Sequence, residues 1–262
     1  MNLEVVFPDK TLEAVVRDTL KKPEQPLTKV DLERLEVLNA GDREIEDLTE
    51  LEQCVNLTRL DLRDNEIIDA TPLASLTNLV HLDLRDNWIS DISPLASLPN
   101  LTWLGHNRVP DITPLASLTG LTSLVLEANR ISDISPLASR TNLTRLRLED
   151  NQISDISPLA LLARLTGLRL WNNRISDISP LVSLTNLTRL GLEGNQISDI
   201  SPLTSLANLT GLWLEENQIS DISPLTSLTN LTGLWLEDDP LSQESIDVHV
   251  SALESRGVDV SL

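Results

Sequence analysis

Residues Leu143–Arg164 read LTRLRLEDNQISDISPLALLAR, and residues Leu187–Asn208 read LTRLGLEGNQISDISPLTSLAN. Both stretches follow one 22-residue template, L-x-x-L-x-L-x-x-N-x-I-x-D-I-x-P-L-x-x-L-x-x. A period of this length is typical of a solenoid, because each repeat buries its apolar face only by stacking on its neighbours. The repeats begin at Leu35, Leu57, Leu79, Leu101, Leu121, Leu143, Leu165, Leu187, Leu209 and Leu231.

Each template position predicts a local structure. The L-x-L segment predicts a short strand whose fourth and sixth residues point inward and whose third, fifth and seventh residues point outward. The asparagine at the ninth position is expected to satisfy buried backbone groups where the chain leaves the strand. The Ser-Pro-Leu segment favours a helical turn too short for an α-helix, so we expect 3₁₀ turns. The ninth-position residues are Asn65, Asn87, Asn107, Asn129, Asn151, Asn173, Asn195 and Asn217.

Three repeats depart from the template. The first carries Arg43 and the last carries Asp239 where asparagine is expected, which is typical of the ends of a solenoid. The repeat that begins at Leu101 is two residues short, and its alignment leaves out the sixth-position leucine. Either its strand bulges or the strand is lost. We interpret the short repeat as a tolerated defect, with a kink at a binding site as the alternative.

The sequence resembles leucine-rich repeat proteins, in particular the bacterial internalin-like type with 22-residue repeats. The resemblance implies an α/β solenoid, a right-handed superhelix with a concave parallel β-sheet, 3₁₀ turns on the convex side and a helical N-terminal cap. The corresponding division is a cap at 1–34, ten repeats at 35–241, and a C-terminal cap helix with an edge strand at 242–262. Phe7-Pro8-Asp9 and Thr28-Lys29-Val30-Asp31 carry the resemblance to the N-terminal cap.

Composition excludes several classes of function. Asp and Glu number 40 and Lys and Arg number 20, so the net charge of −20 opposes binding to nucleic acid and to anionic membranes. The single cysteine excludes a disulfide framework, and no apolar run is long enough to insert into a membrane. No phosphate-binding loop, nucleophile elbow or zinc-protease motif is present, so we expect no cofactor and no enzyme activity. The charge and the atypical end repeats predict a monomer.

Two sets of polar residues suggest metal binding as an alternative. An aspartate recurs at the thirteenth position; stacked carboxylates could bind cations, but we favour acceptance of backbone N–H groups in the turn. The residues are Asp47, Asp69, Asp91, Asp111, Asp133, Asp155, Asp177, Asp199 and Asp221. His81 and His106, with Asp61 and Asp83, could hold a transition metal; a polar contact patch is the preferred interpretation, so no metal site is predicted.

The tryptophans point to a binding surface. None of the five occupies a core leucine position, whereas the whole chain has one Phe and no Tyr. Tryptophan and arginine dominate the binding energy of protein interfaces. Gly211 and Gly233 precede Trp213 and Trp235 at the third position, and Gly191 fills the tryptophan column one repeat earlier. These small neighbours are expected to leave the rings open on both sides, with the two rings about 5 Å apart. The predicted partner-binding residues are Trp103, Arg145, Arg147, Arg169, Trp171, Arg189, Trp213, Glu215 and Trp235.

These observations predict a non-catalytic recognition module that binds a protein partner through its concave face. The family resemblance implies the same class of partner. The alternative is a structural or engineered repeat scaffold with no evolved partner. Residues 1–9 show no basic segment and no long apolar segment of a signal peptide, which leaves a cytoplasmic protein and a fragment of a secreted protein as the two alternatives.

Overall fold

The computed structural model describes residues 4–106 and 109–262, which form two compact units, residues 1–129 and residues 130–262. Asn107, predicted to belong to the asparagine ladder, lies outside the described residues. The elements of the first unit are α1 (Lys10–Leu20), α2 (Lys29–Leu32), β1 (Val37–Asn39), η1 (Leu51–Gln53), β2 (Arg59–Asp61), η2 (Thr71–Ser75), β3 (His81–Leu84), η3 (Ser93–Ser97), β4 (Trp103–His106), η4 (Thr113–Ser117) and β5 (Ser123–Val125).

The second unit continues the alternation of strands and tight turns. Its elements are η5 (Ser135–Leu137), β6 (Arg145–Arg147), η6 (Ser157–Leu161), β7 (Gly167–Arg169), η7 (Ser179–Ser183), β8 (Arg189–Gly191), η8 (Ser201–Ser205), β9 (Gly211–Trp213), η9 (Ser223–Ser227), β10 (Gly233–Trp235), η10 (Ser245–Val250), α3 (Ser251–Ser255) and β11 (Asp259–Ser261). The segments η1 to η9 are 3₁₀ turns, and η10 is a π-helix.

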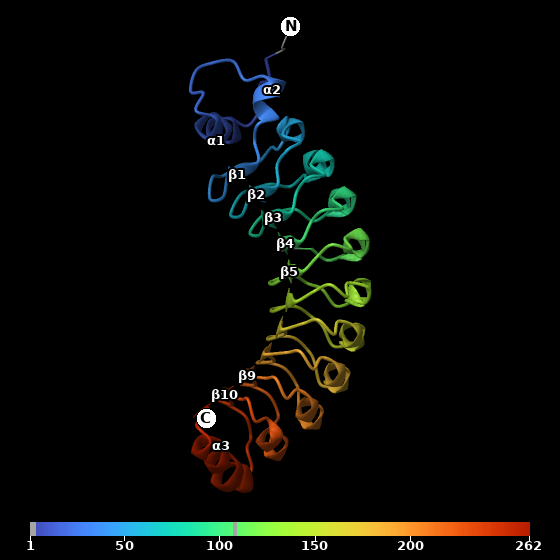
Figure 1. The fold of residues 1–262 in the computed structure, drawn as a ribbon, viewed down its shortest axis with the longest axis vertical. Coiled ribbons are helices and arrows are strands. Elements are labelled where there is room, and N and C mark those ends of the chain that lie inside the picture. Colours follow the sequence, from blue (N-terminus) through green and yellow to red (C-terminus); the bar gives the residue numbers. More distant parts are fainter. Residues whose placement is uncertain (1–3, 107–108) are drawn as a thin grey trace. The chain divides into compact units, whose positions relative to one another are not determined.

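Within each unit the strands are parallel and stand in sequence order, with the 3₁₀ turns on the opposite side (Figure 1). The register is in phase: Leu168, Leu190, Leu212 and Leu234 stand side by side at the fourth template position. The side chains at the fourth and sixth positions of β6 to β10 are at most 1% exposed. The predicted inward and outward phase is therefore confirmed, and the fold is an α/β solenoid.

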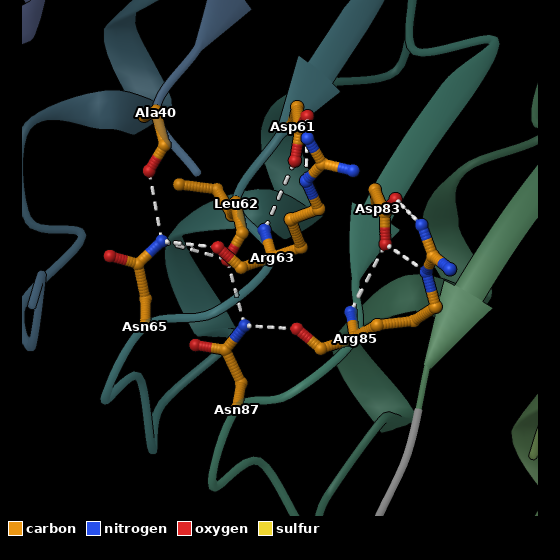
Figure 2. A network of polar contacts seen from close by, with 8 residues as sticks. All are labelled: Ala40, Asp61, Leu62, Arg63, Asn65, Asp83, Arg85 and Asn87. Carbon is orange, nitrogen blue, oxygen red and sulfur yellow. Dashed lines mark hydrogen bonds and ion pairs between the residues drawn. The ribbon is translucent and has the colours of Figure 1, made fainter. Parts of the chain in front are cut away.

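The asparagine ladder satisfies the backbone where each strand ends. The Asn173 amide donates to the carbonyl of Leu170 in its own repeat at 3.0 Å and to that of Leu148 in the preceding repeat at 2.9 Å. Its Oδ1 accepts the N–H of Ile153 at 3.0 Å. Figure 2 shows Asn65 and Asn87 donating in the same way. Each of these amides thus joins two repeats through groups that would otherwise be buried without partners.

The row of aspartates acts on the backbone. Oδ1 of Asp177 accepts the N–H of Ser179 at 2.8 Å, and the same bond recurs from Asp47–Thr49 to Asp221–Ser223. This interaction opens the turn, and from Asp69 onward the aspartate stands three residues before the proline. It also lowers the pKa of the Asp177 carboxyl. The preferred interpretation of this row is confirmed.

Short helices cover the first repeat and follow the last. The Asp9 carboxylate caps α1 by accepting the N–H of Leu12 at 2.8 Å. Asp31 accepts the Thr28 hydroxyl at 2.7 Å and its N–H at 3.1 Å, and an ion pair with Lys22 lowers its pKa to about 2. At the other end, β11 pairs with β10 along its length. No helix in the described part of the chain has the length and apolarity needed to span a bilayer.

The short repeat retains its strand. β4 pairs with β3 through four residues, and His106 stands opposite Leu84, at the sixth position. Val109 occupies the eleventh template position. Its N–H donates to Oδ1 of Asn129, the same bond that the eleventh-position isoleucines make to the ladder asparagine of the next repeat. The alternative in which the strand is lost is therefore wrong. The two-residue deletion falls between His106 and Val109, after the strand rather than within it.

Two polar residues violate the template inside the solenoid. Arg140 takes the place of the leucine represented by Leu162 in the next repeat, is 5% exposed, and its Nε and Nη1 have no hydrogen-bond partner. Asp239 replaces the ladder asparagine; its Oδ1 accepts the N–H of Ile219 at 2.9 Å, but its buried Oδ2 has no partner. Each residue leaves a polar atom without a hydrogen bond, which costs stability.

We expect Arg140→Leu to raise the free energy of unfolding by about 1–3 kcal/mol, because it removes a buried guanidinium and restores the apolar contact. The measurement is chemical denaturation. Arg174→Leu, at an exposed position, is the control and should give no gain. A lower stability for Arg140→Leu would show that the guanidinium is satisfied in solution.

We expect Asp239→Asn to stabilise the protein in a pH-dependent way. Burial raises the pKa of Asp239 from 3.8 to about 6. The protonated carboxyl therefore contributes its whole stabilising effect below pH 3.8, and this contribution is lost as the pH rises through about 6. The gain in Tm from Asn should therefore be larger at about pH 7.5 than at about pH 4. Asn217→Asp is the mirror-image control and should destabilise at the higher pH. An equal gain at both pH values would contradict this account.

Candidate functional site

The solvent-facing side chains at the third, fifth and seventh template positions form what we call the strand face. In the second unit the third positions hold Arg145, Gly167, Arg189, Gly211 and Gly233, and the fifth hold Arg147, Arg169, Gly191, Trp213 and Trp235. The seventh positions hold Glu149, Trp171, Glu193, Glu215 and Glu237. All predicted partner-binding residues except Trp103 lie on this part of the strand face; Trp103 belongs to the first unit.

Trp213 and Trp235 form an ordered aromatic stack. Their ring centroids are 4.7 Å apart and the ring planes are inclined by 4°, close to the spacing expected from the sequence. Parallel pairing of β9 with β10 produces this distance, because Trp213 stands directly opposite Trp235. Both rings are half-buried and lie outside the leucine core.

Glycines make the stack possible, in a different way from the one expected. A Cβ at Gly211 would lie 2.8 Å from Cη2 of Trp213, and one at Gly233 would lie 2.7 Å from Cη2 of Trp235. The edge of each ring therefore packs against the glycine two residues earlier in its own strand. The expectation that these glycines leave the rings open is wrong: the rings cover the glycine backbone, which holds them in one orientation.

A row of partly buried carboxylates runs beside the stack. The Oε2 atoms of Glu193, Glu215 and Glu237 are buried and have no hydrogen-bond partner. Burial raises the pKa of Glu193 from 4.5 to about 7, and it also raises the pKa of Glu215. The row thus presents carboxylates that a cationic group would stabilise.

The arginines at the start of the second unit are arranged around Glu149. Arg147 Nε donates to Oε1 of Glu149 at 2.8 Å, and Arg169 Nη1 lies 3.7 Å from the same atom. Glu149 is completely buried, whereas Arg145 and Arg189 are exposed. Trp171, 36% exposed, stands one repeat after Glu149 at the same template position. This region has a mixed charge and projects long side chains into solvent.

Trp103 belongs to a separate polar cluster in the first unit. The His81 ring stacks on the Trp103 ring at 4.1 Å, and the Arg85 guanidinium lies 5.9 Å from the Trp103 ring centroid. Arg85 also donates two bonds to the Asp83 carboxylate, at 2.9 Å and 2.7 Å (Figure 2). Burial, then the charge of Arg59, lowers the pKa of His81. The cluster is an aromatic ring in contact with an imidazole and with a guanidinium that a carboxylate anchors.

The sequence analysis missed two of these groupings. The His81–Trp103 stack could have been found from the register, because consecutive repeats place their third positions side by side. The packing of Glu193 against Gly191 has no signal in the template, since it depends on how the glutamate side chain folds back. Among the residues described, no group of three or more His, Cys, Asp or Glu could hold a metal ion. Burial raises the pKa of the Cys54 thiol to about 12.

Comparison with known proteins agrees with the repeat architecture. A family model described as leucine-rich repeats in two copies matches residues 163–205 and 207–248, and a single leucine-rich repeat model matches residues 53–70, 75–92 and 140–157. A search of curated proteins gives no match.

Solved structures match along most of the chain. Internalin F from Listeria monocytogenes is 34% identical, with a TM-score of 0.73, and the match covers 99% of this chain and 91% of that chain. Internalin C2 from the same species is 40% identical, with a TM-score of 0.76, over 80% of this chain and 94% of that chain. A leucine-rich repeat protein from Leptospira interrogans is 25% identical, with a TM-score of 0.80, and the match covers 88% of this chain and 62% of that chain. From the repeats, the parallel strands and these matches together, we conclude that the chain belongs to the bacterial internalin-like leucine-rich repeat family.

Proposed function

We propose that the chain is a non-catalytic recognition module whose strand face in the second unit binds a protein partner. The observation that carries this proposal is the Trp213–Trp235 stack, ordered and half-exposed, outside a core made almost entirely of leucine and isoleucine. Tryptophans with fixed rings bind with little loss of conformational entropy. The fold supports the proposal, because leucine-rich repeat solenoids serve as extended interaction surfaces.

The remaining predicted residues extend the surface around the stack. Glu215 lies beside Trp213 in the carboxylate row, and Trp171 and the exposed arginines lie toward β6. We assign Arg145, Arg147, Arg169 and Arg189 to the rim, where charged groups guide association more than they hold the complex. Trp103 with His81 and Arg85 is proposed as a second contact region in the first unit.

We expect Trp213→Ala with Trp235→Ala to abolish capture of a protein partner while the fold remains intact. Each tryptophan at such a position is worth about 2 kcal/mol or more of binding, or about thirtyfold in Kd. The stability cost should be near 1 kcal/mol per ring, because the rings pack on each other and on glycine rather than in the core. Binding is measured by affinity capture from extracts and stability by circular dichroism.

The matched control is Leu161→Ala with Val182→Ala, which removes two exposed apolar side chains from the 3₁₀ turns of the same unit. This control should capture the same partner as the unmodified chain. Loss of capture in both variants would indicate a nonspecific apolar surface. Full capture by the tryptophan variant would place the binding surface elsewhere on the chain.

A further inference from the structure

The fifth-position row of the second unit is interrupted next to the tryptophan stack. Gly191 stands opposite Arg169 on one side and opposite Trp213 on the other. Trp235 covers one face of the Trp213 ring, whereas the neighbour at the same position on the β8 side has no side chain. One face of the stack therefore borders a position where the strand supplies nothing to cover it.

The Glu193 carboxylate occupies the place of the missing side chain. Its Oε2 lies 2.9 Å from where a Cβ of residue 191 would stand, and this atom is buried without a hydrogen-bond partner. A buried carboxylate oxygen without a donor costs free energy, and this cost is removed when the carboxylate turns to meet a donor. The β8 side of the tryptophan stack therefore borders the Glu193 carboxylate rather than a side chain of residue 191.

The charges around Gly191 favour a cation. Glu215 and Glu237 follow Glu193 in the carboxylate row, each with a buried Oε2 that lacks a donor. Arg169 lies 3.7 Å from Glu149, which is already paired with Arg147. Burial raises the pKa of Glu193 to about 7; its own backbone N–H and the charge of Arg169 oppose this rise, and the charges of Glu215 and Glu149 add to it. The local balance is negative, as is that of the whole chain.

In the first unit a carboxylate, a guanidinium and a tryptophan ring occur together within the chain. There Arg85 is held by the Asp83 carboxylate at 2.7 Å and lies over the Trp103 ring at 5.9 Å. This geometry is a cation–π contact. At Gly191 the carboxylate and the tryptophan are both present, and the arginine is the component that the chain does not supply.

We propose that an arginine side chain of the protein partner binds at Gly191, with its guanidinium stacked on Trp213 and donating to the Glu193 carboxylate. The inference rests on the proposed function and specifies the partner's chemistry at one point. Arginine fits better than lysine, because a planar guanidinium can stack on an indole and donate in parallel to one carboxylate. An uncharged planar group would leave the charge of Glu193 uncompensated.

The test uses small probes, which makes it independent of the partner's identity. The full-length chain is titrated with N-acetyl-arginine amide, and the indole N–H signals of its five tryptophans are followed by NMR. N-acetyl-citrulline amide, a neutral isostere, and N-acetyl-lysine amide are the comparison probes. We expect saturable shifts of the Trp213 and Trp235 signals with arginine, weaker shifts with lysine and none with citrulline. No saturable shift with arginine, or an equal response to citrulline, would overturn the proposal.

Two variants locate the site. Glu193→Gln should weaken arginine binding by about tenfold, the ratio expected on losing a charge-assisted hydrogen bond. Its control is Glu216→Gln, which removes an exposed carboxylate nearby and should leave the affinity within about twofold. Equal losses in both variants would mean that the probe reads only the overall negative charge, and the proposed site would be wrong.

Gly191→Val should remove the site by displacing the Glu193 carboxylate, whose Oε2 lies 2.9 Å from the position of the new Cβ, while the tryptophans stay in place. Valine is favourable in an extended strand, and its nearest obstacle is the mobile end of Glu193. Gly167→Val is the matched control on the adjacent strand, where the only atom within 4 Å of a new Cβ is Cγ of Arg145, at 4.0 Å. Binding of arginine should be lost in the first variant and kept in the second; retention in both would contradict the site.

The affinity for the arginine probe should also rise with pH through about 7, because binding requires the ionised Glu193 carboxylate. Glu193→Gln should remove this dependence, and a pH profile unchanged by Glu193→Gln would count against the site. If the probe does not bind but the tryptophan variant still loses its partner, the arginine site is wrong and the recognition surface stands. If the probe binds but capture of a partner does not depend on the tryptophans, the arginine site stands and the proposed recognition surface is wrong.

Discussion

Hydrogen bonding of the backbone at the end of each strand is the constraint on which the rest of the structure depends. A parallel strand of three or four residues must turn sharply out of a closely packed core, and its carbonyl groups would then be buried without donors. The ladder amides supply both donors and an acceptor, and each bridges its own repeat to the preceding one. An ionised aspartate can supply only acceptors, and for this reason Asp239 at the end of the ladder accepts the N–H of Ile219 but leaves its second oxygen without a partner.

This ladder also determines where functional residues can lie. Because the turn is held at the same place in every repeat, the strands stay in phase and the third, fifth and seventh positions lie on the side of the sheet opposite the leucine core. The repeat core consists mainly of leucine and isoleucine side chains, and none of the tryptophans occupies a core leucine position. A parallel register repeated at strand spacing turns two tryptophans in consecutive repeats into a stack without any further specification.

The strand face also carries polar groups that are incompletely satisfied. In the first unit the carboxylate of Asp83 is saturated by Arg85, whereas the second unit has carboxylate oxygens without donors beside its tryptophans. Such atoms are unfavourable in an isolated protein, and in the complex that we propose an arginine of the partner would supply the missing donor. The same rule of hydrogen-bond satisfaction thus explains the ladder within the chain and motivates the proposed contact with a partner.

The sequence by itself determined the fold class, the phase of the strands and the backbone role of the asparagines and aspartates, because a fixed period repeats the same physical requirement ten times. It also placed the tryptophans outside the core and gave the spacing of Trp213 and Trp235. The tertiary structure decided how these rings lie over Gly211 and Gly233, and where the deletion in the short repeat falls. It alone showed Glu193 folded over Gly191, since the direction of a long side chain depends on its spatial neighbours and leaves no trace in the period.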